Sequence, residues 1–283
     1  VHPFSFEEAL RHAGTALPAD PRHVTAAERS MLEHALLRYL DVGGFPEVQS
    51  VSVADRHELL LRYVDVAMLR DVIERHNVTN VLGLHWLVRH LLGNPGGLFS
   101  VEKFHSRLKS LGIAIARDTL HALLGYLEDC FLVRTTWLEA ASVRRRMVNP
   151  RKIHPLDPGF IPIFDQTGRA NRGHALETAV RVELERRRMQ VTYIKTRDGF
   201  EVDFLARPAG GGRPALVQVS AELTDAETRS REVRALLAAH AEYQDASLHL
   251  VTLTPEFADD VPESIEVHPA WRWFLGTPGH EET

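Results

Sequence analysis

Residues 190–220 read QVTYIKTRDGFEVDFLARPAGGGRPALVQVS, and this stretch decides the fold. Asp198-Gly199 and Gly210-Gly211-Gly212 interrupt it, and both are turn signals, the first being typical of a two-residue hairpin. Between the turns lie runs rich in β-branched and aromatic residues, which favour strands. The three runs are 190–196, 200–206 and 215–220. The segment therefore predicts three consecutive antiparallel strands.

The sequence on either side adds two helices and a fourth strand. Residues 173–189 and 225–240 carry apolar side chains at helical spacing, and residues 247–253 read as a strand. The resulting order is αβββαβ, so we expect a four-stranded mixed sheet with helices packed on it. A helix joins the last two strands, which predicts that they are parallel with a right-handed crossover.

Acidic residues on the second of these strands form a candidate site. Side chains alternate along a strand, so Glu201, Asp203 and Leu205 are expected on one face and Val202, Phe204 and Ala206 on the other. Two carboxylates on one face suit a divalent cation such as Mg²⁺. Glu177, on the preceding helix, could supply a third oxygen, and Gln218 and Ser220 face the pair from the next strand. The alternative is a solvated strand face or a pair of arginine partners.

The first 95 residues read as an all-helical segment. Apolar side chains recur at helical spacing over residues 26–39, 54–75 and 81–92. The turn Val42-Gly43-Gly44-Phe45-Pro46 ends the first of these helices. We therefore expect a helical segment over 1–95.

Residues 96–157 predict a winged helix. A helix capped by Ser100 and a second helix over 117–129 are followed by a strand over 131–137. Residues 143–149 and 152–156 could add a hairpin arm. Winged helices commonly bind DNA. The second helix carries few cations, however, so sequence-specific reading of bases is not expected. A packing module is the alternative, and a third domain is expected over 158–283.

Charge is distributed unevenly along the 283 residues. The formal net charge is −5, yet residues 89–152 hold 11 basic and 5 acidic side chains. The densest basic group is expected near the wing and comprises Arg144, Arg145, Arg146, Arg151 and Lys152. Such a patch can bind a phosphate backbone. Contact with an acidic neighbouring domain is equally compatible with it.

Three further observations limit the class of protein. Cys130 is the single cysteine, so no intramolecular disulfide forms, and a cytoplasmic location fits best. No apolar run reaches the roughly 20 residues of a membrane-spanning helix. The 16 histidines show no zinc-finger spacing and are expected to be scattered through surface and core.

The element order and the acidic residues resemble the PD-(D/E)xK nuclease fold. In active members a helix glutamate, an acid on the second strand and an acid-x-lysine motif on the third strand hold Mg²⁺ and activate water. Glu177 and Asp203 match the first two positions and are the metal ligands that the resemblance implies. The third-strand motif is Gln218-Val219-Ser220, in which glutamine replaces the acid and serine replaces the lysine. The resemblance thus implies a degenerate site, with Lys195 on the adjacent strand as a possible substitute lysine.

The chain as a whole looks like the region that follows the ATPase core in prokaryotic AAA-type ATP-binding proteins. The segments that carry this resemblance include HPFSFEE (2–8), YLDVGGFPE (39–47), LRDV (69–72), YLED (126–129), HALE (174–177), EVDF (201–204), QVS (218–220) and REV (231–233). The family implies an upstream ATPase domain, a winged helix and a nuclease-like domain of unknown function. No Gly-x-x-x-x-Gly-Lys-Ser/Thr motif is present, so this chain is not expected to bind ATP.

Three functions remain open from the sequence. The first is a non-catalytic module that binds DNA or a protein partner under the control of an ATPase. The second is an active Mg²⁺-dependent nuclease that uses Glu177, Glu201 and Asp203. The third is a purely structural or oligomerisation domain.

Overall fold

One eight-stranded mixed sheet runs through the molecule. The computed structural model describes residues 2–165, 171–255 and 260–276. The strand order is β1-β3-β2-β4-β5-β6-β7-β8. The strands are β1 (Leu98–Phe99), β2 (Val133–Leu138), β3 (Arg151–Pro155), β4 (Met189–Lys195), β5 (Glu201–Pro208), β6 (Ala215–Ser220), β7 (Ser247–Thr252) and β8 (Ile265–Pro269).

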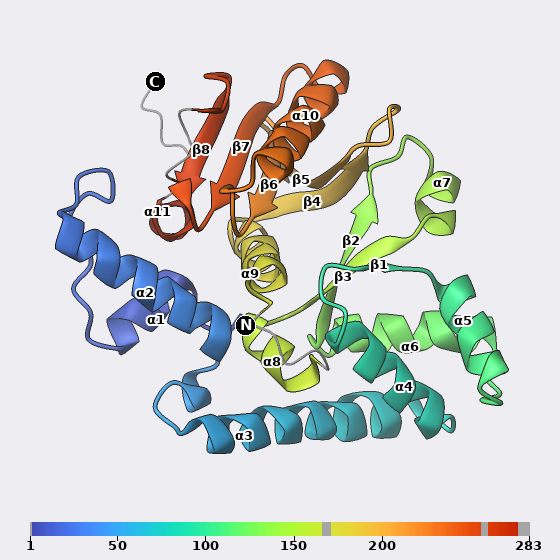
Figure 1. Ribbon diagram of the computed structural model, residues 1–283. Coiled ribbons are helices and arrows are strands. Elements are labelled where there is room, and N and C mark those ends of the chain that lie inside the picture. Colours follow the sequence, from blue (N-terminus) through green and yellow to red (C-terminus); the bar gives the residue numbers. More distant parts are fainter. Residues whose placement is uncertain (1, 166–170, 256–259, 277–283) are drawn as a thin grey trace.

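Helices surround this sheet (Figure 1). The α-helices are α1 (Phe6–His12), α2 (Ala26–Val42), α3 (Val53–Val66), α4 (Val81–Leu92), α5 (Val101–Ser110), α6 (Arg117–Asp129), α7 (Val143–Val148), α8 (Ile161–Phe164), α9 (Arg172–Arg186), α10 (Ala226–Glu242) and α11 (Ala270–Leu275). Two short 3₁₀ turns, η1 (Pro46–Val48) and η3 (Pro158–Phe160), and the π-helical stretch η2 (Ala67–Glu74), which continues α3, complete the chain.

The strand meander and its parallel extension were predicted correctly. Strands β4, β5 and β6 are antiparallel, with Asp198-Gly199 at the first turn, and β6 pairs with β7 in parallel across α10. The prediction of a four-stranded sheet is wrong. Strand β8 adds to β7, and β2 pairs in parallel with β4 through Trp137 and Leu138, which joins β1, β3 and β2 to the same sheet.

Helices α9 and α10 cover opposite faces of the sheet. Leu176 and Val180 of α9 pack with Val217 of β6 in one core, whereas Leu236 of α10 packs with Leu216 in another. Phe6 of α1 and the apolar face of α2 also belong to the α9 core. A third core joins residues between Val42 and Phe160, including the buried apolar residues of α4 and α6.

The predicted alternation along β5 is interrupted by a bulge. The pairing with β4 shifts between Thr192 and Ile194, so that two residues of β5, Asp203 and Phe204, lie between the paired positions Val202 and Leu205. As a result Val202 and Leu205 both enter the α10 core, and Phe204 enters the α9 core. The expectation that Leu205 shares a face with Glu201 and Asp203 is therefore wrong, because a bulge resets the side-chain alternation.

The region of the predicted wing contains a short helix. Residues 143–148 form α7, and Ser142 caps its N-terminus with a hydroxyl that accepts a hydrogen bond from the Arg145 backbone N–H. The hairpin arm expected from 143–149 is absent at those described residues, and Arg151–Pro155 pairs with both β1 and β2 instead. The divisions at residues 95 and 157 stay predictions, although the pairing of β2 with β4 carries the sheet across residue 157.

Asp157 fixes the glycine turn after α2 to the segment after β3. Its carboxylate accepts hydrogen bonds from the Gly44 N–H at 2.7 Å and from the Gly159 N–H at 2.8 Å. Burial raises the pKa of Asp157 to about 7, although both N–H groups oppose the shift. Gly43 has φ of +82°, which favours glycine, and lies against this carboxylate.

Candidate functional site

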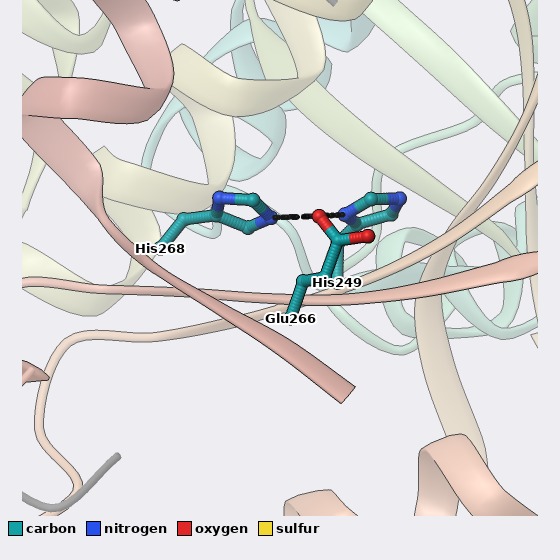
Figure 2. Close-up of side chains that lie close together, drawn as sticks. All are labelled: His249, Glu266 and His268. Atoms are coloured by element: carbon teal, nitrogen blue, oxygen red, sulfur yellow. Dashed lines mark hydrogen bonds and ion pairs between the residues drawn. The ribbon is translucent and has the colours of Figure 1, made fainter. Parts of the chain in front are cut away.

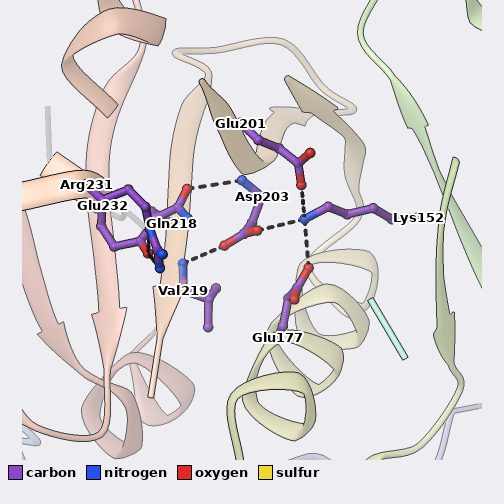
Figure 3. Close-up of polar contacts among 8 residues, drawn as sticks. All are labelled: Lys152, Glu177, Glu201, Asp203, Gln218, Val219, Arg231 and Glu232. Carbon is purple, nitrogen blue, oxygen red and sulfur yellow. Dashed lines mark hydrogen bonds and ion pairs between the residues drawn. The ribbon is translucent and has the colours of Figure 1, made fainter. Parts of the chain in front are cut away.

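Three carboxylates from two elements converge on one lysine from a third. Glu177 lies on α9, Glu201 and Asp203 lie at the start of β5, and Lys152 reaches them from β3 (Figure 3). Helix α9 is buried almost all round, from Ala175 to Val182, so the Glu177 side chain points into the protein. The strand bulge places Asp203 on the same side of the sheet as α9.

The lysine ammonium is in contact with all three acids. Its Nζ lies 2.8 Å from Asp203 Oδ1, 2.9 Å from Glu201 Oε1 and 3.1 Å from Glu177 Oε1. Only 5% of the Lys152 side chain is exposed, against 35% for Glu201. A buried ammonium has three hydrogens to donate, and here each has a carboxylate partner.

The single ammonium and the three acids around it shift one another's pKa values. Burial lowers the pKa of the Lys152 amine, but the charges of Asp203, Glu177 and Glu201 outweigh burial and leave the pKa above its usual value. Burial and the nearby Asp203 raise the pKa of Glu177 to about 8, against the opposing pull of Lys152. We conclude that Lys152 is charged and that Glu177 retains a proton near neutral pH.

Both ends of the Gln218 amide make hydrogen bonds. Its Oε1 accepts from the Asp203 N–H at 3.2 Å, and its Nε2 donates to Glu232 Oε2 at 2.7 Å. Glu232 also pairs with Arg231 at 2.7 Å. The second oxygen of Asp203 accepts from the Val219 N–H at 3.0 Å (Figure 3). The glutamine thus joins β5 to α10 and leaves no carboxylate at the third-strand position.

The carboxylate oxygens are spread too widely to hold a small cation as they stand. A Mg²⁺ ion with bonds of about 2.1 Å keeps its ligand oxygens within roughly 4.2 Å of one another. Across 2–165, 171–255 and 260–276, one group of three His, Cys, Asp or Glu residues has all its ligand atoms within 4.8 Å, and it is not this one. The oxygens of Glu177, Glu201 and Asp203 are arranged around an ammonium instead.

Four residues of this site are predicted by the sequence to lie together, whereas the fifth, Lys152, is predicted to lie in a basic patch. Glu177, Glu201, Asp203 and Gln218 come together as expected. The Ser220 hydroxyl donates to the Glu222 carbonyl at 2.9 Å, whereas the lysine contacts the three acids. Lys195 is exposed at the β4 position paired with Glu201, and the lysine that contacts the acids is Lys152.

The predicted basic cluster is divided by the fold. Arg144 and Arg145 are exposed on α7, and Arg146 is half-buried. The assignment of Arg151 and Lys152 to an exposed basic surface is wrong, because both side chains are buried on β3. The Arg151 guanidinium stacks on the Trp137 ring at 4.1 Å. Lys152 pairs with Leu98 of β1 and with Thr136 of β2, whereas Arg151 pairs with Phe99 of β1.

Replacing Glu177 with glutamine is expected to flatten the dependence of stability on pH. The pKa of Glu177 is about 8 in the folded chain and 4.5 in its ordinary state, so the folded chain holds an extra proton between these values. Stability contributed by that proton is present at low pH and is lost as pH rises from about 4.5 to about 8. The free energy of unfolding in urea should therefore fall less between pH 5.5 and pH 8.5 in Glu177→Gln than in the wild type. Glu222→Gln, at an exposed glutamate, is the control. An equal fall in unfolding free energy in all three proteins would contradict the raised pKa of Glu177.

Comparison with known proteins gives relatives without an assigned activity. A family model described as a domain of unknown function (DUF8612) matches residues 33–168. An uncharacterized protein of Methanocaldococcus jannaschii is 28% identical over 287 aligned positions, which cover 97% of this chain. The chain spans 62% of that relative's length. No solved structure matches, and none of the described helices is both long and apolar enough to cross a membrane. The chain is thus similar to an archaeal protein over nearly its whole length.

Proposed function

We propose that this chain is a catalytically inert, nuclease-like module that acts by binding a protein partner. The observation that carries the proposal is the position of Lys152, whose ammonium contacts Glu177, Glu201 and Asp203 at once. In a metal-dependent nuclease, carboxylates of this kind hold the divalent cation. Here the cluster already contains a cation that belongs to the chain itself.

The hydrogen bonds around the cluster support an inert site. Gln218 stands where the resemblance expects a metal-binding acid, and its amide is engaged on both sides by Asp203 and Glu232. A backbone turn also covers Glu177, since a Cβ atom built on Gly96 would lie 2.8 Å from Glu177 Oε2. A metal ion would have to displace Lys152 and draw the carboxylates together, at a cost in desolvation and strain.

A row of exposed apolar side chains favours a protein partner over nucleic acid. Leu59, Tyr63, Val66 and Leu69 are 39–50% exposed and recur every three or four residues along α3 and η2. Such spacing places them on one side of a helix. Two of the five cations predicted to contact a phosphate backbone are buried. The resemblance to AAA-type proteins indicates an ATP-binding domain as the class of partner.

An active nuclease is the second candidate, and one observation favours it. Lys152 brings to Asp203 and Glu177 the amine that Ser220 cannot supply, so three acids and a lysine lie together. In that case Lys152 would have to move aside to admit Mg²⁺ and then stabilise charge on the phosphate.

A cleavage assay separates the two candidates. Labelled single- and double-stranded DNA and RNA are incubated with the protein and Mg²⁺ or Mn²⁺, beside Asp203→Asn purified in the same way. We expect no cleavage above the level of Asp203→Asn, which controls for contaminating nucleases. Metal-dependent cleavage by the wild type that Asp203→Asn loses would establish the second candidate instead.

A binding assay tests the preference for a protein partner. We expect the protein to show no DNA binding of the kind that phosphate contacts would produce. Such binding of fluorescent DNA would weaken as salt rises and would depend on Arg144 and Arg145. Salt-dependent binding that is lost in Arg144→Ala/Arg145→Ala would contradict the preference and identify α7 as a nucleic-acid contact.

A further inference from the structure

Two histidines and a glutamate meet at the edge of the sheet, away from the Lys152 cluster. His249 lies on β7, and Glu266 and His268 lie on the edge strand β8 (Figure 2). The parallel register pairs His249 with Glu266 and Val251 with His268. Val251 belongs to the α9 core, so alternation places all three polar side chains on the same face as α9.

The three ligand atoms lie within a few tenths of an ångström of the spacing of a tetrahedral metal site. His249 Nδ1 lies 2.9 Å from His268 Nε2, and each of these nitrogens lies 3.6 Å from Glu266 Oε2. A tetrahedral ion with bonds of about 2.0–2.1 Å holds its ligand atoms roughly 3.3–3.4 Å apart. Shifts of a few tenths of an ångström therefore bring all three atoms to bonding distance of one ion.

Neighbouring groups leave the imidazoles able to bind a metal. His249 Nε2 lies 2.7 Å from Ser247 Oγ, and a hydrogen bond donated by this nitrogen directs the lone pair of Nδ1 towards His268 and Glu266. Both histidine side chains are largely buried, which disfavours their charged form.

Cations also face the cluster. The charge of Arg213 disfavours protonation of His249, and the charge of Glu266 favours it. The charges of Arg272 and Arg187 disfavour protonation of His268. The Glu266 carboxylate supplies the negative charge that a divalent ion requires beside these arginines.

We propose that His249, Glu266 and His268 bind one divalent transition-metal ion of the zinc class. Two neutral imidazoles and one carboxylate are typical ligands of Zn²⁺, and three protein ligands leave a fourth position open. The Glu266 side chain is 63% exposed, against 19% for His249 and 22% for His268, so solvent reaches the cluster from the side of Glu266. Among the residues that the structure describes, this is the one such group whose ligand atoms all lie within 4.8 Å of one another.

The proposal is independent of the inert nuclease-like site. The Lys152 cluster offers carboxylates that surround an ammonium, whereas the sheet-edge cluster offers imidazoles, which zinc prefers over magnesium. The competing interpretation is a hydrogen-bonded histidine pair beside a surface glutamate. Metal binding separates these two interpretations directly.

Zinc titration of the full chain, stripped of metal by chelator, tests the site. We expect one Zn²⁺ per chain in competition with a chromophoric chelator, and a Co²⁺ spectrum typical of tetrahedral coordination. His268→Ala and His249→Ala should weaken binding at least about 100-fold, since even outer partners of a metal site are worth 10–100-fold. Glu266→Gln should weaken it about 10-fold or more.

Controls make each outcome decisive. His240→Ala, on α10, and Asp203→Asn should both retain the full zinc stoichiometry, which separates this site from other histidines and from the Lys152 cluster. Circular dichroism and thermal melts verify that each variant is folded. The absence of a stoichiometric zinc site in the wild type, or unchanged affinity in both His268→Ala and Glu266→Gln, would overturn the proposal.

Discussion

Replacing Lys152 with alanine should lower the free energy of unfolding by about 3–5 kcal/mol. The substitution removes the one cation that contacts Glu177, Glu201 and Asp203, and it leaves the negative charges of Glu201 and Asp203 side by side without a counter-ion. Breaking a buried ion pair by removing one partner has a cost of this size, because the remaining charge has lost its solvent and its partner. Urea denaturation at pH 7 measures the change.

The loss of unfolding free energy in Lys152→Ala should become smaller as the pH falls. Without the ammonium the carboxylates repel one another in the folded chain, so protonation at low pH relieves the repulsion and the deficit grows as pH rises. Lys195→Ala is the matched control, since this lysine is exposed on the neighbouring strand, and it should change stability by less than about 0.5 kcal/mol. A loss below about 1 kcal/mol for Lys152→Ala, or one that does not change with pH, would contradict the role assigned to Lys152.

Replacing Gly43 with alanine should destabilise the chain by more than about 3 kcal/mol or prevent folding. An added Cβ would lie 1.7 Å from Asp157 Oδ1 and 2.9 Å from the Gly159 nitrogen, so it would displace the carboxylate that holds the two segments together. The backbone of Gly43, with φ of +82° and ψ of −174°, lies in a region essentially restricted to glycine, which adds about 1–3 kcal/mol of strain.

Gly112→Ala is a control that places alanine at a positive φ without a steric clash. Gly112 has a similar φ of +77°, yet nothing lies within 4 Å of the Cβ that would be added. Its cost should therefore be limited to about 1–2 kcal/mol of backbone strain. Soluble yield and urea midpoints compare the two variants. Equal losses would show that the Gly43–Asp157 contact adds nothing beyond the backbone conformation.

The local features of the fold could be predicted from the sequence. The Asp198-Gly199 turn and the alternating runs predicted the β4–β6 meander, and α4 and α6 begin and end at the expected residues. These elements follow from short-range signals such as caps, turns and apolar spacing. Glu177, Asp203 and Gln218 were predicted to share a site for the same reason, because each occupies a defined place on a predicted helix or strand.

Features that depend on distant pairing could not be predicted. Lys152 is 25 residues from Glu177 and 51 from Asp203, and only the joining of β2 to β4 brings β3 beside α9. The lysine was therefore assigned to a basic surface. The histidines were judged by spacing along the chain, whereas His249 and His268 meet across two parallel strands. The bulge in β5 left no local signal, and it reversed the expected direction of Leu205.

Manganese binding tests the central claim most directly, because the claim is that Lys152 takes the place of a divalent cation at Asp203. Electron paramagnetic resonance counts bound Mn²⁺ in the wild type and in Asp203→Asn, and any binding at His249 and His268 contributes equally to both. We predict the same number of bound ions and the same affinity in the two proteins. One additional Mn²⁺ in the wild type, absent from Asp203→Asn, would show that the carboxylates hold a metal and would contradict the account.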